Sequence, residues 1–505
     1  MGHTPRSPAS DFRASPAAIL TGIVLIASAL RLASLGAGFS YDEIFVTGFA
    51  GSRWRDILPM LRAGEFHPPL YYLLMRAWAG LFGTGEAAFR LPSACFGILA
   101  VLLTYALMRR LFPAPVSLLG AFLVAVSPLH IIISQEARMY ALVGMLVLAS
   151  TLALVAGVDR GGMPRWAGYV LLSTLMVYTQ YLAWLVLLAH GIWTAVSERR
   201  HLDKWMAAAA GVAILYAPWV PSLWAQAVHL HGAVWSHGSA LNGRDPGDLL
   251  GLFAFGGSLF GMASYFFPGR QGPGGQFAIL LPFLIILWRG GVKTASDRRR
   301  MLLLGGLPAV TVGATVAVSL MIGTFYPRWL SFLFPFYAMF IAAGIFDVAE
   351  RMRGWRDGAL AVLTAGLLAY SVPVLGSYYG DPGFNHFQWR AAATLVKHQV
   401  KAGDFFLYVS NATRTAFTYY YREPHPSLTL TMADLLAGGG GTPLFTDARA
   451  RGLAARHPRL WLIVGVPFTR PMQEQLFGTL KGPFRVIGAR QFTGIGIYLV
   501  AAGSP

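Results

Sequence analysis

Charged side chains are scarce in this 505-residue sequence. Only 12% of its residues are Asp, Glu, Lys or Arg, whereas a soluble domain carries about 25%. So small a fraction cannot cover a water-facing surface, which excludes a soluble enzyme, a disordered chain and a coiled coil. Hydrophobic residues make up 55% of the chain, and its mean hydropathy is +0.54. The composition therefore predicts a polytopic α-helical membrane protein.

Cysteine and acidic residues are also in short supply. Cys95 is the only cysteine, which excludes an intramolecular disulfide and a cysteine-rich metal site. The chain has 22 acidic against 40 basic residues, for a net charge of +18. In a membrane protein, basic loops on the cytoplasmic face account for such an excess. We therefore predict membrane lipid, and no nucleic acid, as the partner of these charges.

Long apolar stretches predict about eleven membrane spans, since a spanning helix needs about 20 apolar residues. Residues 1–15 are polar and form a predicted cytoplasmic tail. No small-residue cleavage site follows the first apolar stretch, so it is predicted to be retained. The Gly-rich stretch 248–267 is predicted to lie at the membrane interface. The predicted spans are 16–36, 87–108, 116–134, 139–158, 166–184, 185–197, 205–224, 273–289, 301–323, 329–349 and 358–376.

The distribution of basic residues predicts the orientation. With the N-terminus inside, the cytoplasmic loops hold fifteen Lys and Arg, and the short outer loops hold four. This bias is the positive-inside pattern. If the stretch 67–83 spanned the membrane, every later loop would invert, so it is predicted to be a juxtamembrane helix in the long first outer loop, 37–86. The sequence thus predicts a multi-pass protein of a bacterial inner membrane.

Composition changes at about residue 377, where the long apolar runs stop. Apolar stretches of strand length follow at 404–409, 460–466 and 494–500, with an amphipathic helical stretch at 387–400. Residues 377–505 are therefore predicted to form a small α/β domain on the outer, periplasmic face. Gly438–Gly441 is not followed by a phosphate-binding Lys and is predicted to be a loop. We find no internal repeat typical of a transporter built from two halves.

The predicted topology gathers several ionisable residues at the outer face. Charged groups near membrane depth are costly and tend to be functional. The topology rests on cytoplasmic charges alone. It nevertheless places three acids, one histidine and three arginines on the outer face. These residues are Asp42, Glu43, His67, Arg90, Glu136, Arg138 and Arg328.

Each of these residues also has a structural interpretation. The pattern SYDE around Asp42 is typical of a helix N-terminal cap. Glu136 and Arg138 form a plausible structural pair in a turn, and His67 precedes two prolines in a loop. Arg90 and Arg328 are placed where arginines reach lipid headgroups.

Three other features have simpler explanations. His190 is expected to be a satisfied buried histidine. The cluster HLHGAVWSH at 229–237 lacks a carboxylate or cysteine that would complete a zinc site. The glycosylation-type triplet at 411–413 is common by chance. We predict no metal and no cofactor.

The outer cluster suits group transfer from a phosphorylated lipid. An apolar bundle holds the lipid tail, and arginine forks bind phosphate oxygens. A carboxylate accepts the proton of an attacking hydroxyl. Negative charge develops on the departing phosphate, so the same arginines stabilise the transition state.

Six segments in this order resemble a known family. They are YDE at 41–43, HPPLYYLL at 67–74, FRLPSACFG at 89–97, SPLHIIISQEARMYAL at 127–142, YTQYLA at 178–183 and FYPRWL at 325–330. The first 350 residues resemble family-39-type glycosyltransferases with the GT-C fold, related to protein O-mannosyltransferases and to the aminoarabinose transferase acting on lipid A. The segment after 377 matches only loosely.

The resemblance implies a polyprenyl-phosphate sugar donor, a hydroxyl acceptor, inversion at the sugar and a periplasmic site. It implies that Asp42 is the base, supported by Glu43, and that His67, Arg138 and Arg328 bind the donor phosphate. Supporting roles fall to the matching Arg90, Glu136, Tyr140 and Tyr181. Two positions depart from the family pattern: Gln180 where His is expected, and Trp329 where Tyr is usual.

Two other classes compete with a glycosyltransferase. A transporter or flippase of a lipid-linked anionic substrate would place polar groups near the midplane of the bilayer. A structural subunit whose outer domain binds polysaccharide would give no reason for Asp42, His67 and Arg138 to converge. The sequence leaves open the sugar, the acceptor, the carrier length and the oligomeric state.

Overall fold

The computed structural model describes most of the chain. Its described residues are 15–65, 67–233, 285–322, 327–352, 354–381, 387–435, 444–465 and 470–503. The predicted interface helix 248–267 and the glycine loop 438–441 lie outside them. So do the side chains of His229, His231 and His237, on which the zinc alternative depended.

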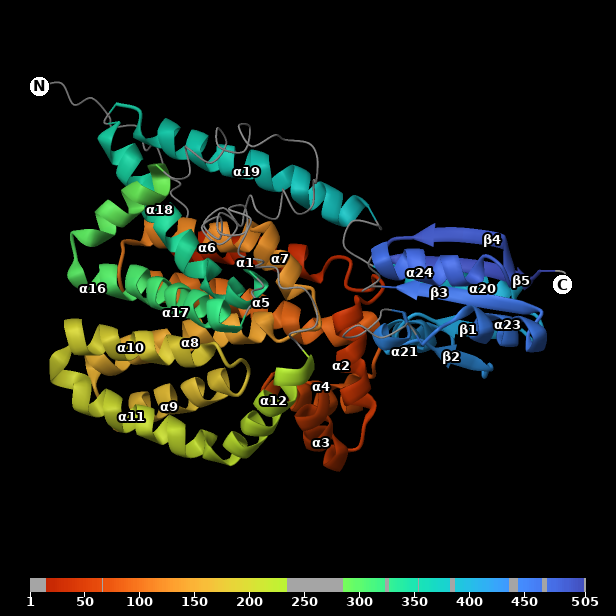
Figure 1. Cartoon of the computed structure of the whole chain (residues 1–505). Coiled ribbons are helices and arrows are strands. Elements are labelled where there is room, and N and C mark those ends of the chain that lie inside the picture. Colours follow the sequence, from red (N-terminus) through yellow and green to blue (C-terminus); the bar gives the residue numbers. More distant parts are fainter. Residues whose placement is uncertain are drawn as a thin grey trace, which may run out of the picture. The chain divides into compact units, whose positions relative to one another are not determined.

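The described residues are mostly helical, with five strands near the C-terminus (Figure 1). The helices are α1 (Pro16–Leu32), α2 (Tyr41–Gly51), α3 (Trp54–Gly64), α4 (Leu70–Phe82), α5 (Glu86–Met108), α6 (Ala114–Val126), α7 (Pro128–Ser134), α8 (Tyr140–Arg160), α9 (Met163–Val177), α10 (Ala183–Ser197), α11 (Leu202–Tyr216), α12 (Val220–Ala233), α16 (Arg298–Met301), α17 (Leu307–Ile322), α18 (Phe334–Arg351), α19 (Arg356–Gly380), α20 (Trp389–Gln399), α21 (Asn411–Tyr420), α22 (Met432–Leu435), α23 (Asp447–Arg456) and α24 (Arg470–Leu480). Shorter helical turns are η1 (Arg199–His201), η2 (Ala217–Trp219), the π-helical η3 (Leu302–Gly306) and η4 (Pro327–Leu333). The strands are β1 (Phe405–Tyr408), β2 (Ser427–Thr429), β3 (Arg459–Gly465), β4 (Phe484–Phe492) and β5 (Ile495–Ala502).

The chain divides into two compact units. The first, here called the helical unit, comprises Met1–Leu35, Trp54–Leu74 and Arg90–Val374. The second, here called the sheet unit, comprises Gly36–Arg53, Met75–Phe89 and Leu375–Pro505. Two stretches of the predicted outer loop therefore belong to the same unit as the C-terminal residues.

Six helices in the described part of the chain are long and apolar enough to cross a membrane, or seven if the bent pair α6 and α7 is one span. This confirms a multi-pass membrane protein, although the sequence predicts eleven spans. Several predicted spans are shorter than the roughly 20 residues that a bilayer requires. Helix α1 has 17 residues, and α9 and α10 have 15 each. The predicted span 273–289 lies mostly outside the described residues.

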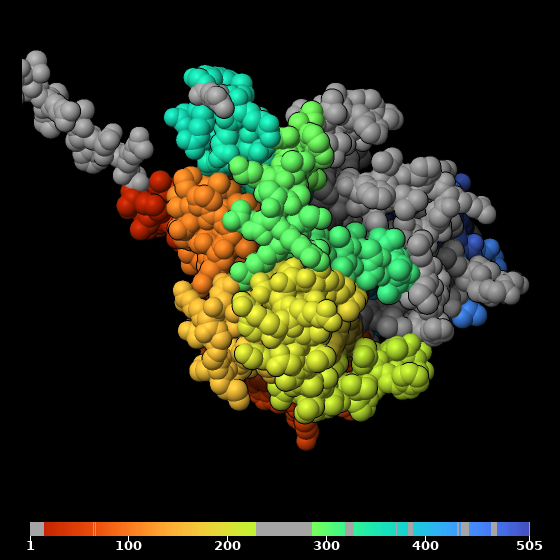
Figure 2. Space-filling view, turned by 90° about the vertical axis from the view of Figure 1, so that its left-hand side faces the viewer, coloured from red at the N-terminus to blue at the C-terminus, as the bar shows by residue number. Residues whose placement is uncertain are grey.

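The helical unit exposes large apolar side chains, as a lipid-facing surface requires. Helices α9 to α11, in yellow in Figure 2, have such residues on their outer surface. The exposed large apolar residues on these helices are Met163, Leu171, Leu188, Ile192, Val196, Met206, Ile214 and Leu215.

Three helix ends predicted to be cytoplasmic meet in the helical unit. The Arg299 guanidinium, on α16, forms an ion pair with Glu198 at 3.0 Å between Nε and Oε1, and another with Asp159. Asp159 lies at the end of α8, and Glu198 follows α10. The three ends therefore lie at one level, as the loop charges predict for one side of a membrane.

The α6–α7 break is held by two buried side chains that cap opposite helices. Ser127 alone separates α6 from α7, which begins at Pro128, and the two helices are bent by 59°. Arg31, fully buried near the end of α1, donates to the carbonyls of Val124 at 2.9 Å and Ala125 at 2.8 Å. In return Gln135, at the end of α7, donates its amide to the carbonyls of Leu30, Arg31 and Ala33 at the end of α1. The carbonyls that helix ends leave unpaired are thus satisfied inside the bundle.

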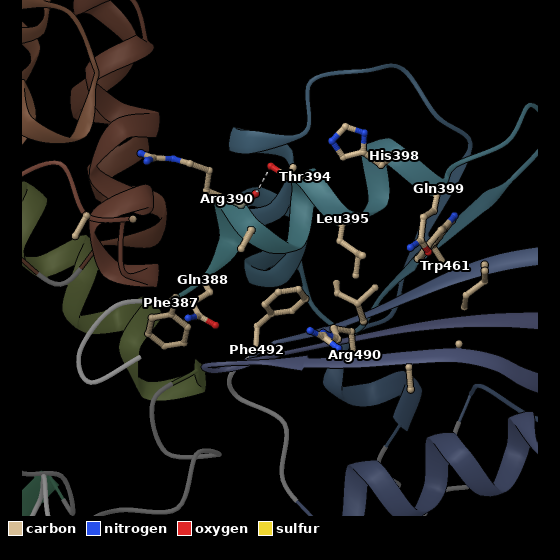
Figure 3. A pocket seen from close by; sticks show the side chains of 17 residues that line it. Phe387, Gln388, Arg390, Thr394, Leu395, His398, Gln399, Trp461, Arg490 and Phe492 are labelled. Atoms are coloured by element: carbon tan, nitrogen blue, oxygen red, sulfur yellow. Dashed lines mark hydrogen bonds between the residues drawn. The ribbon is translucent and has the colours of Figure 1, made fainter. Parts of the chain in front are cut away.

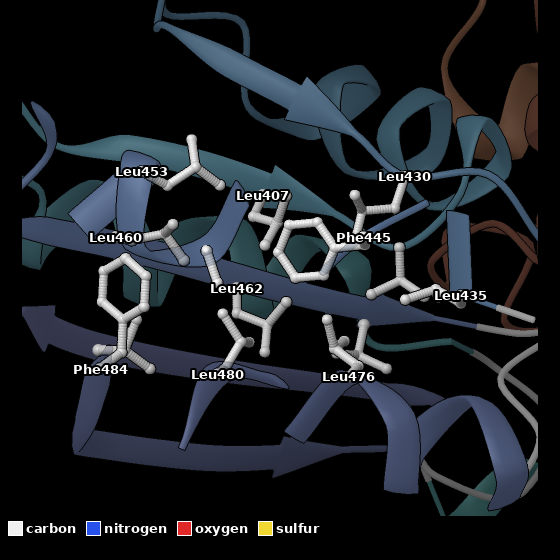
Figure 4. Close-up of a cluster of buried hydrophobic side chains, with 14 of the residues drawn as sticks. Leu407, Leu430, Leu435, Phe445, Leu453, Leu460, Leu462, Leu476, Leu480 and Phe484 are labelled. Carbon is white, nitrogen blue, oxygen red and sulfur yellow. The ribbon is translucent and has the colours of Figure 1, made fainter. Parts of the chain in front are cut away.

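The sheet unit contains a mixed five-stranded sheet in the order β2-β1-β3-β5-β4. Strand β1 is parallel to β2 and β3, and β5 is antiparallel to β3 and β4. Alternate residues of β1 and β3 pack with α23 and α24 into one apolar core, drawn in Figure 4. Helices α20 and α21 pack on the face that carries Trp461. This confirms the predicted small α/β domain.

Strand β4 lies at the edge of the sheet and is exposed along most of its length. Its pairing with β5 shifts register between Val486 and Gly488, which indicates a bulge. The two strands join through a two-residue turn in which Gly494 has a φ of 72°, a conformation that favours glycine.

The outer-loop segments of the sheet unit are held by its C-terminal residues. Tyr420, at the end of α21, accepts a hydrogen bond from the backbone N–H of Phe39 at 2.9 Å. The Tyr419 hydroxyl donates to the carbonyl of Thr84 at 2.8 Å, and Arg390 on α20 forms an ion pair with Glu86. The residues that lead into α2 are therefore anchored on the α/β fold.

Candidate functional site

An acid and a histidine form a buried pair in the α3–α4 loop of the helical unit. The Nδ1 atom of His67 lies 2.7 Å from Oε1 of Glu65. Glu65 is 5% exposed, and Pro68 and Pro69 follow His67 immediately. Since proline fixes its own φ and restricts the preceding residue, this segment holds His67 in place before α4 begins.

The charges around the pair determine its protonation. Burial by itself raises the pKa of Glu65, but the hydrogen bond and charge of His67, the charge of Arg138 and the Tyr72 hydroxyl together lower that pKa to about 2. Burial lowers the pKa of His67, and the positive charges of Arg138 and Arg328 oppose protonation further, although Glu65 favours it. At neutral pH the carboxyl is therefore ionised and the imidazole neutral, with Nδ1–H donating to Glu65.

Two predicted arginines lie beside this pair. Arg138 is 6% exposed and sits in the turn between α7 and α8, where the Ser93 hydroxyl donates to the Arg138 backbone carbonyl at 3.4 Å. Arg328 is exposed, and its guanidinium carbon lies 5.8 Å from the centre of the Tyr140 ring. Both arginines act electrostatically on His67.

Gln180, one of the two residues that depart from the family pattern, anchors the turn that carries Arg328. The Gln180 amide donates to the backbone carbonyl of Trp329 at 2.9 Å. Gln180 and Trp329 are the two residues that depart from the family pattern, and the structure brings them into contact. Beside Gln180, the Tyr181 hydroxyl accepts from Trp219 at 3.0 Å and donates to Gln226. Tyr181 thus packs within the scaffold of the helical unit.

Two supporting residues lie elsewhere in the helical unit. Arg90 is 1% exposed and donates to the carbonyl of Leu35 at 2.9 Å. Glu136 is half-buried in the turn after α7, where its carbonyl accepts from the Arg138 backbone N–H at 2.8 Å. Arg90 thus helps to fix the residues that follow α1, and Glu136 shapes the turn that presents Arg138.

Asp42 and Glu43 belong to the sheet unit and occupy the first turn of α2. Ser40 and Glu43 form a complete capping box, in which the Ser40 backbone N–H donates to Oε2 of Glu43 at 2.8 Å. The pattern SYDE is therefore a cap, as one interpretation of the sequence holds, but Glu43 rather than Asp42 does the capping. Glu43 is 1% exposed, whereas Asp42 is half-buried. The positive end of the α2 dipole stabilises the ionised form of Asp42.

The cluster in the helical unit can bind an anion. One ionised acid, two guanidinium groups and a neutral imidazole leave an excess of one positive charge. Arginine forks suit phosphate oxygens, and Tyr140 fixes Arg328 from one side. Among the described residues, no group of three or more His, Cys, Asp or Glu is placed to hold a metal ion.

The comparisons with known proteins bear on the fold. The family described as dolichyl-phosphate-mannose-protein mannosyltransferase matches residues 66–224. The apo structure of ArnT from Cupriavidus metallidurans is similar with a TM-score of 0.61 at 14% identity, covering 96% of this chain and 99% of that chain. The chain has the GT-C fold.

Other GT-C structures support the same fold. ArnT from Cupriavidus metallidurans bound to undecaprenyl phosphate has a TM-score of 0.58 at 14% identity and the same coverage of 96% and 99%. Oligosaccharyltransferase AglB from Archaeoglobus fulgidus, in complex with an inhibitory peptide and a dolichol-phosphate, has a TM-score of 0.56 at 12% identity, over 96% of this chain and 74% of that chain. No curated protein matches the chain in sequence.

Sequence reasoning missed Glu65 and Tyr72. Both interact with His67 or Arg138, yet Glu65 lies outside the six matching segments. The available signal was composition: in a GT-C chain with only 22 acidic residues, an acid two positions before a candidate histidine merits attention.

Proposed function

We propose that the protein is a membrane glycosyltransferase that moves a sugar from a polyprenyl-phosphate donor to an extracytoplasmic hydroxyl, with inversion. The observation that carries the proposal is the Glu65–His67 pair beside Arg138 and Arg328, which has an excess of positive charge. The GT-C fold and the phosphate-bound relatives support it. The site and the sheet unit are assigned to the periplasmic face of a bacterial inner membrane, on the basis of the cytoplasmic loop charges.

The donor phosphate binds to Arg138 and Arg328, with His67 assisting. A polyprenyl-phosphate sugar is a phosphodiester with one negative charge. When the bond between the anomeric carbon and the phosphate oxygen breaks, the departing polyprenyl phosphate keeps the electron pair and gains a second negative charge. The two guanidiniums stabilise this charge more strongly in the transition state than in the ground state.

Asp42 acts as the general base. It accepts the proton of the acceptor hydroxyl as the oxygen attacks the anomeric carbon from the side opposite the phosphate. A single displacement of this kind inverts the sugar. Its place in the first turn of α2 favours the ionised form before the reaction. Glu43 acts indirectly, because its capping box fixes the helix start that presents Asp42.

The test replaces Asp42 with Asn, which preserves the shape of the side chain and removes its basicity. In proteoliposomes with a polyprenyl-phosphate sugar, turnover should fall by about two to four orders of magnitude, while donor affinity stays unchanged. Asp56→Asn is the matched control, since Asp56 is also in the first turn of a loop helix. Near-normal turnover of Asp42→Asn would refute the assignment. Movement of intact donor across the bilayer without cleavage would instead favour a flippase.

A further inference from the structure

The sheet unit contains a groove of about 870 Å³ that the chemistry above does not use. It lies between α20 and the β4–β5 hairpin (Figure 3). From α20, Leu395 points toward the strands, whereas Arg390 points away from them to its ion pair with Glu86. A volume of this size falls in the range of about 300–1,000 Å³ typical of ligand pockets.

The groove has room for a ligand because small residues form its floor. Gly488 and Ala489 of β4 line it, and the β5 residues Ile497 and Leu499 provide an apolar base. A methyl group at Gly488 would meet only the Leu499 side chain, at 3.6 Å. The space above the hairpin is therefore open to a ligand.

The groove has a positive character. Arg490 of β4 pairs in register with Ile497 and lies beneath α20. No acidic residue in the described part of the chain pairs with Arg490 or lines the groove. His398, Gln388 and Gln399 add further polar groups to its walls. A guanidinium that faces a groove without a carboxylate favours an anionic ligand.

Aromatic rings stand at one end of this groove. Phe387 and Phe492 lie there, and the Phe387 ring is packed so closely on the hairpin turn that a side chain at Gly494 would meet it at 2.3 Å. Aromatic faces beside planar polar side chains suit a saccharide, whose rings have apolar C–H faces and polar edges. Planar guanidinium and amide groups match its hydroxyl and carboxylate oxygens.

The same end of the groove includes Ala37 and Gly38, a few residues before Asp42. Only glycine fits at position 38, because a Cβ there would lie 2.9 Å from the carbonyl oxygen of Phe387. This close contact ties the wall of the groove to the segment that continues through Ser40, the cap of α2, to Asp42. A ligand bound in the groove is thereby linked, within one unit, to the segment that carries the base.

We propose that this groove binds an acidic saccharide portion of the acceptor, with its carboxylate or phosphate on Arg490 and its sugar rings against Phe387 and Phe492. This proposal rests on the proposed function, because it supplies the acceptor side of the same transfer. Binding in the groove does not depend on the residues proposed to bind the donor, which are His67, Arg138 and Arg328. The two proposals can therefore fail separately.

The test uses the full chain in detergent and measures binding of trigalacturonate against neutral maltotriose by calorimetry. Wild type should bind the acidic trisaccharide at least about ten-fold more tightly, and added salt should weaken it. Arg490→Gln should reduce this affinity about ten-fold or more. Gly488→Phe should abolish binding by filling the groove. Arg485→Gln, an exposed arginine on the same strand that does not line the groove, should bind as wild type does.

Donor binding, measured on the same preparations with a polyprenyl-phosphate sugar, should be unchanged in Arg490→Gln and Gly488→Phe. Protection of the sheet unit from limited proteolysis, compared with wild type, shows separately that this unit is folded in both variants. Failure of wild type to bind trigalacturonate, equal affinity for maltotriose, or equal losses in Arg485→Gln and Arg490→Gln would each overturn the groove proposal. Trigalacturonate binding by a protein that binds no donor would leave the groove proposal standing and defeat the proposed function.

Discussion

At the scale of single residues, the proposed donor site depends on keeping a histidine neutral next to an ionised acid. His67 donates to Glu65, and the guanidiniums of Arg138 and Arg328 oppose a further positive charge on the imidazole. The surrounding charges of this cluster therefore favour an anion. Ligand binding and proton uptake should be coupled as a result.

This coupling makes donor affinity depend on pH. The pKa of His67 lies below 6.5 in the free protein, and a bound phosphodiester raises it, because the added negative charge favours the imidazolium. The complex then binds more protons than the free protein, so affinity should rise as the pH falls from 7.5 to 5. Each unit of pKa change is worth about ten-fold in affinity. Titrations with a polyprenyl phosphodiester should show this slope in wild type and lose it in His67→Gln. The same slope in both proteins would show that another group titrates.

The arginines should differ from their neighbours in how they affect donor affinity. Arg138→Ala and Arg328→Ala should each weaken donor binding by about 1.5–3 kcal/mol, the value of a charge-assisted contact. Lysine at either position should restore only part of the lost donor-binding free energy, because the fork geometry of arginine is lost. Arg62→Ala is the control, since Arg62 lies on α3 and donates instead to Ser222 at 2.8 Å. Unchanged donor dissociation constants in both alanine variants would contradict phosphate binding by these arginines and leave Arg328 as a lipid anchor.

The residues of the cluster were predictable only in part. His67, Arg138 and Arg328 follow from ordered segments and topology. The contact between Gln180 and Trp329 does not, because a side chain that donates to a backbone carbonyl across 149 residues leaves no local pattern. Glu43 and Asp42 show the opposite case: the sequence predicts a cap, but only the geometry shows which acid forms it.

At the scale of elements, α1 and the α6–α7 pair stabilise each other through buried polar side chains. The ends of helices in a membrane interior need partners, since no water reaches them. Arg31 supplies hydrogen bonds to α6, and Gln135 supplies them to α1. The 59° bend is therefore a fixed feature of the bundle.

Removing Arg31 should destabilise the protein markedly. Arg31→Met keeps an apolar stem of similar length but leaves the carbonyls of Val124 and Ala125 unsatisfied, at a cost of about 2–5 kcal/mol. Arg160→Met is the matched control, because Arg160 is also in the last turn of an apolar helix but is exposed. Thermal unfolding in detergent should show a large fall in Tm for the first variant and little change for the second. Similar Tm values for the two variants would contradict the capping role.

Elements with a regular apolar pattern were predicted well, and exposed or short ones were not. Buried β3 and β5 and amphipathic α20 were predicted within a few residues. Strand β4 was not predicted, because it is exposed along most of its length and so has no alternation of apolar and polar residues. Strand β2 was not predicted because it is only three residues long. Hydropathy also ignores bends, which is why the span predicted over 116–134 did not anticipate the 59° bend between α6 and α7.

At the scale of the whole molecule, sidedness is the property on which the proposed function depends. The single cysteine, Cys95, makes it directly measurable. In a Cys95→Ala background, Asn411→Cys places a thiol on the exposed start of α21, and Ser296→Cys places one in an exposed loop predicted to be cytoplasmic. A membrane-impermeant maleimide applied to intact cells should label the first variant and spare the second. The reverse pattern would place the sheet unit inside and defeat the periplasmic assignment.

The overall architecture was predictable because it depends on sums over many residues. Low charge, long apolar runs and a change of composition near residue 377 predict a membrane bundle followed by an α/β domain, and both are present. The sequence did not predict that stretches 36–53 and 75–89 group with the C-terminal residues. That grouping depends on single contacts such as Tyr420 with Phe39 and Tyr419 with Thr84. Hydropathy and composition averaged over a sequence window do not detect such contacts.

The bulged edge strand β4 also bears on how the protein behaves among its own copies. An exposed strand edge is a template on which a second chain can pair and begin to aggregate. The register shift at Val486–Gly488 interrupts that template, and Arg485 and Arg490 would bring like charges together if two such edges met. The irregular strand therefore disfavours edge-to-edge pairing between two molecules, while its hairpin still forms the floor of a groove.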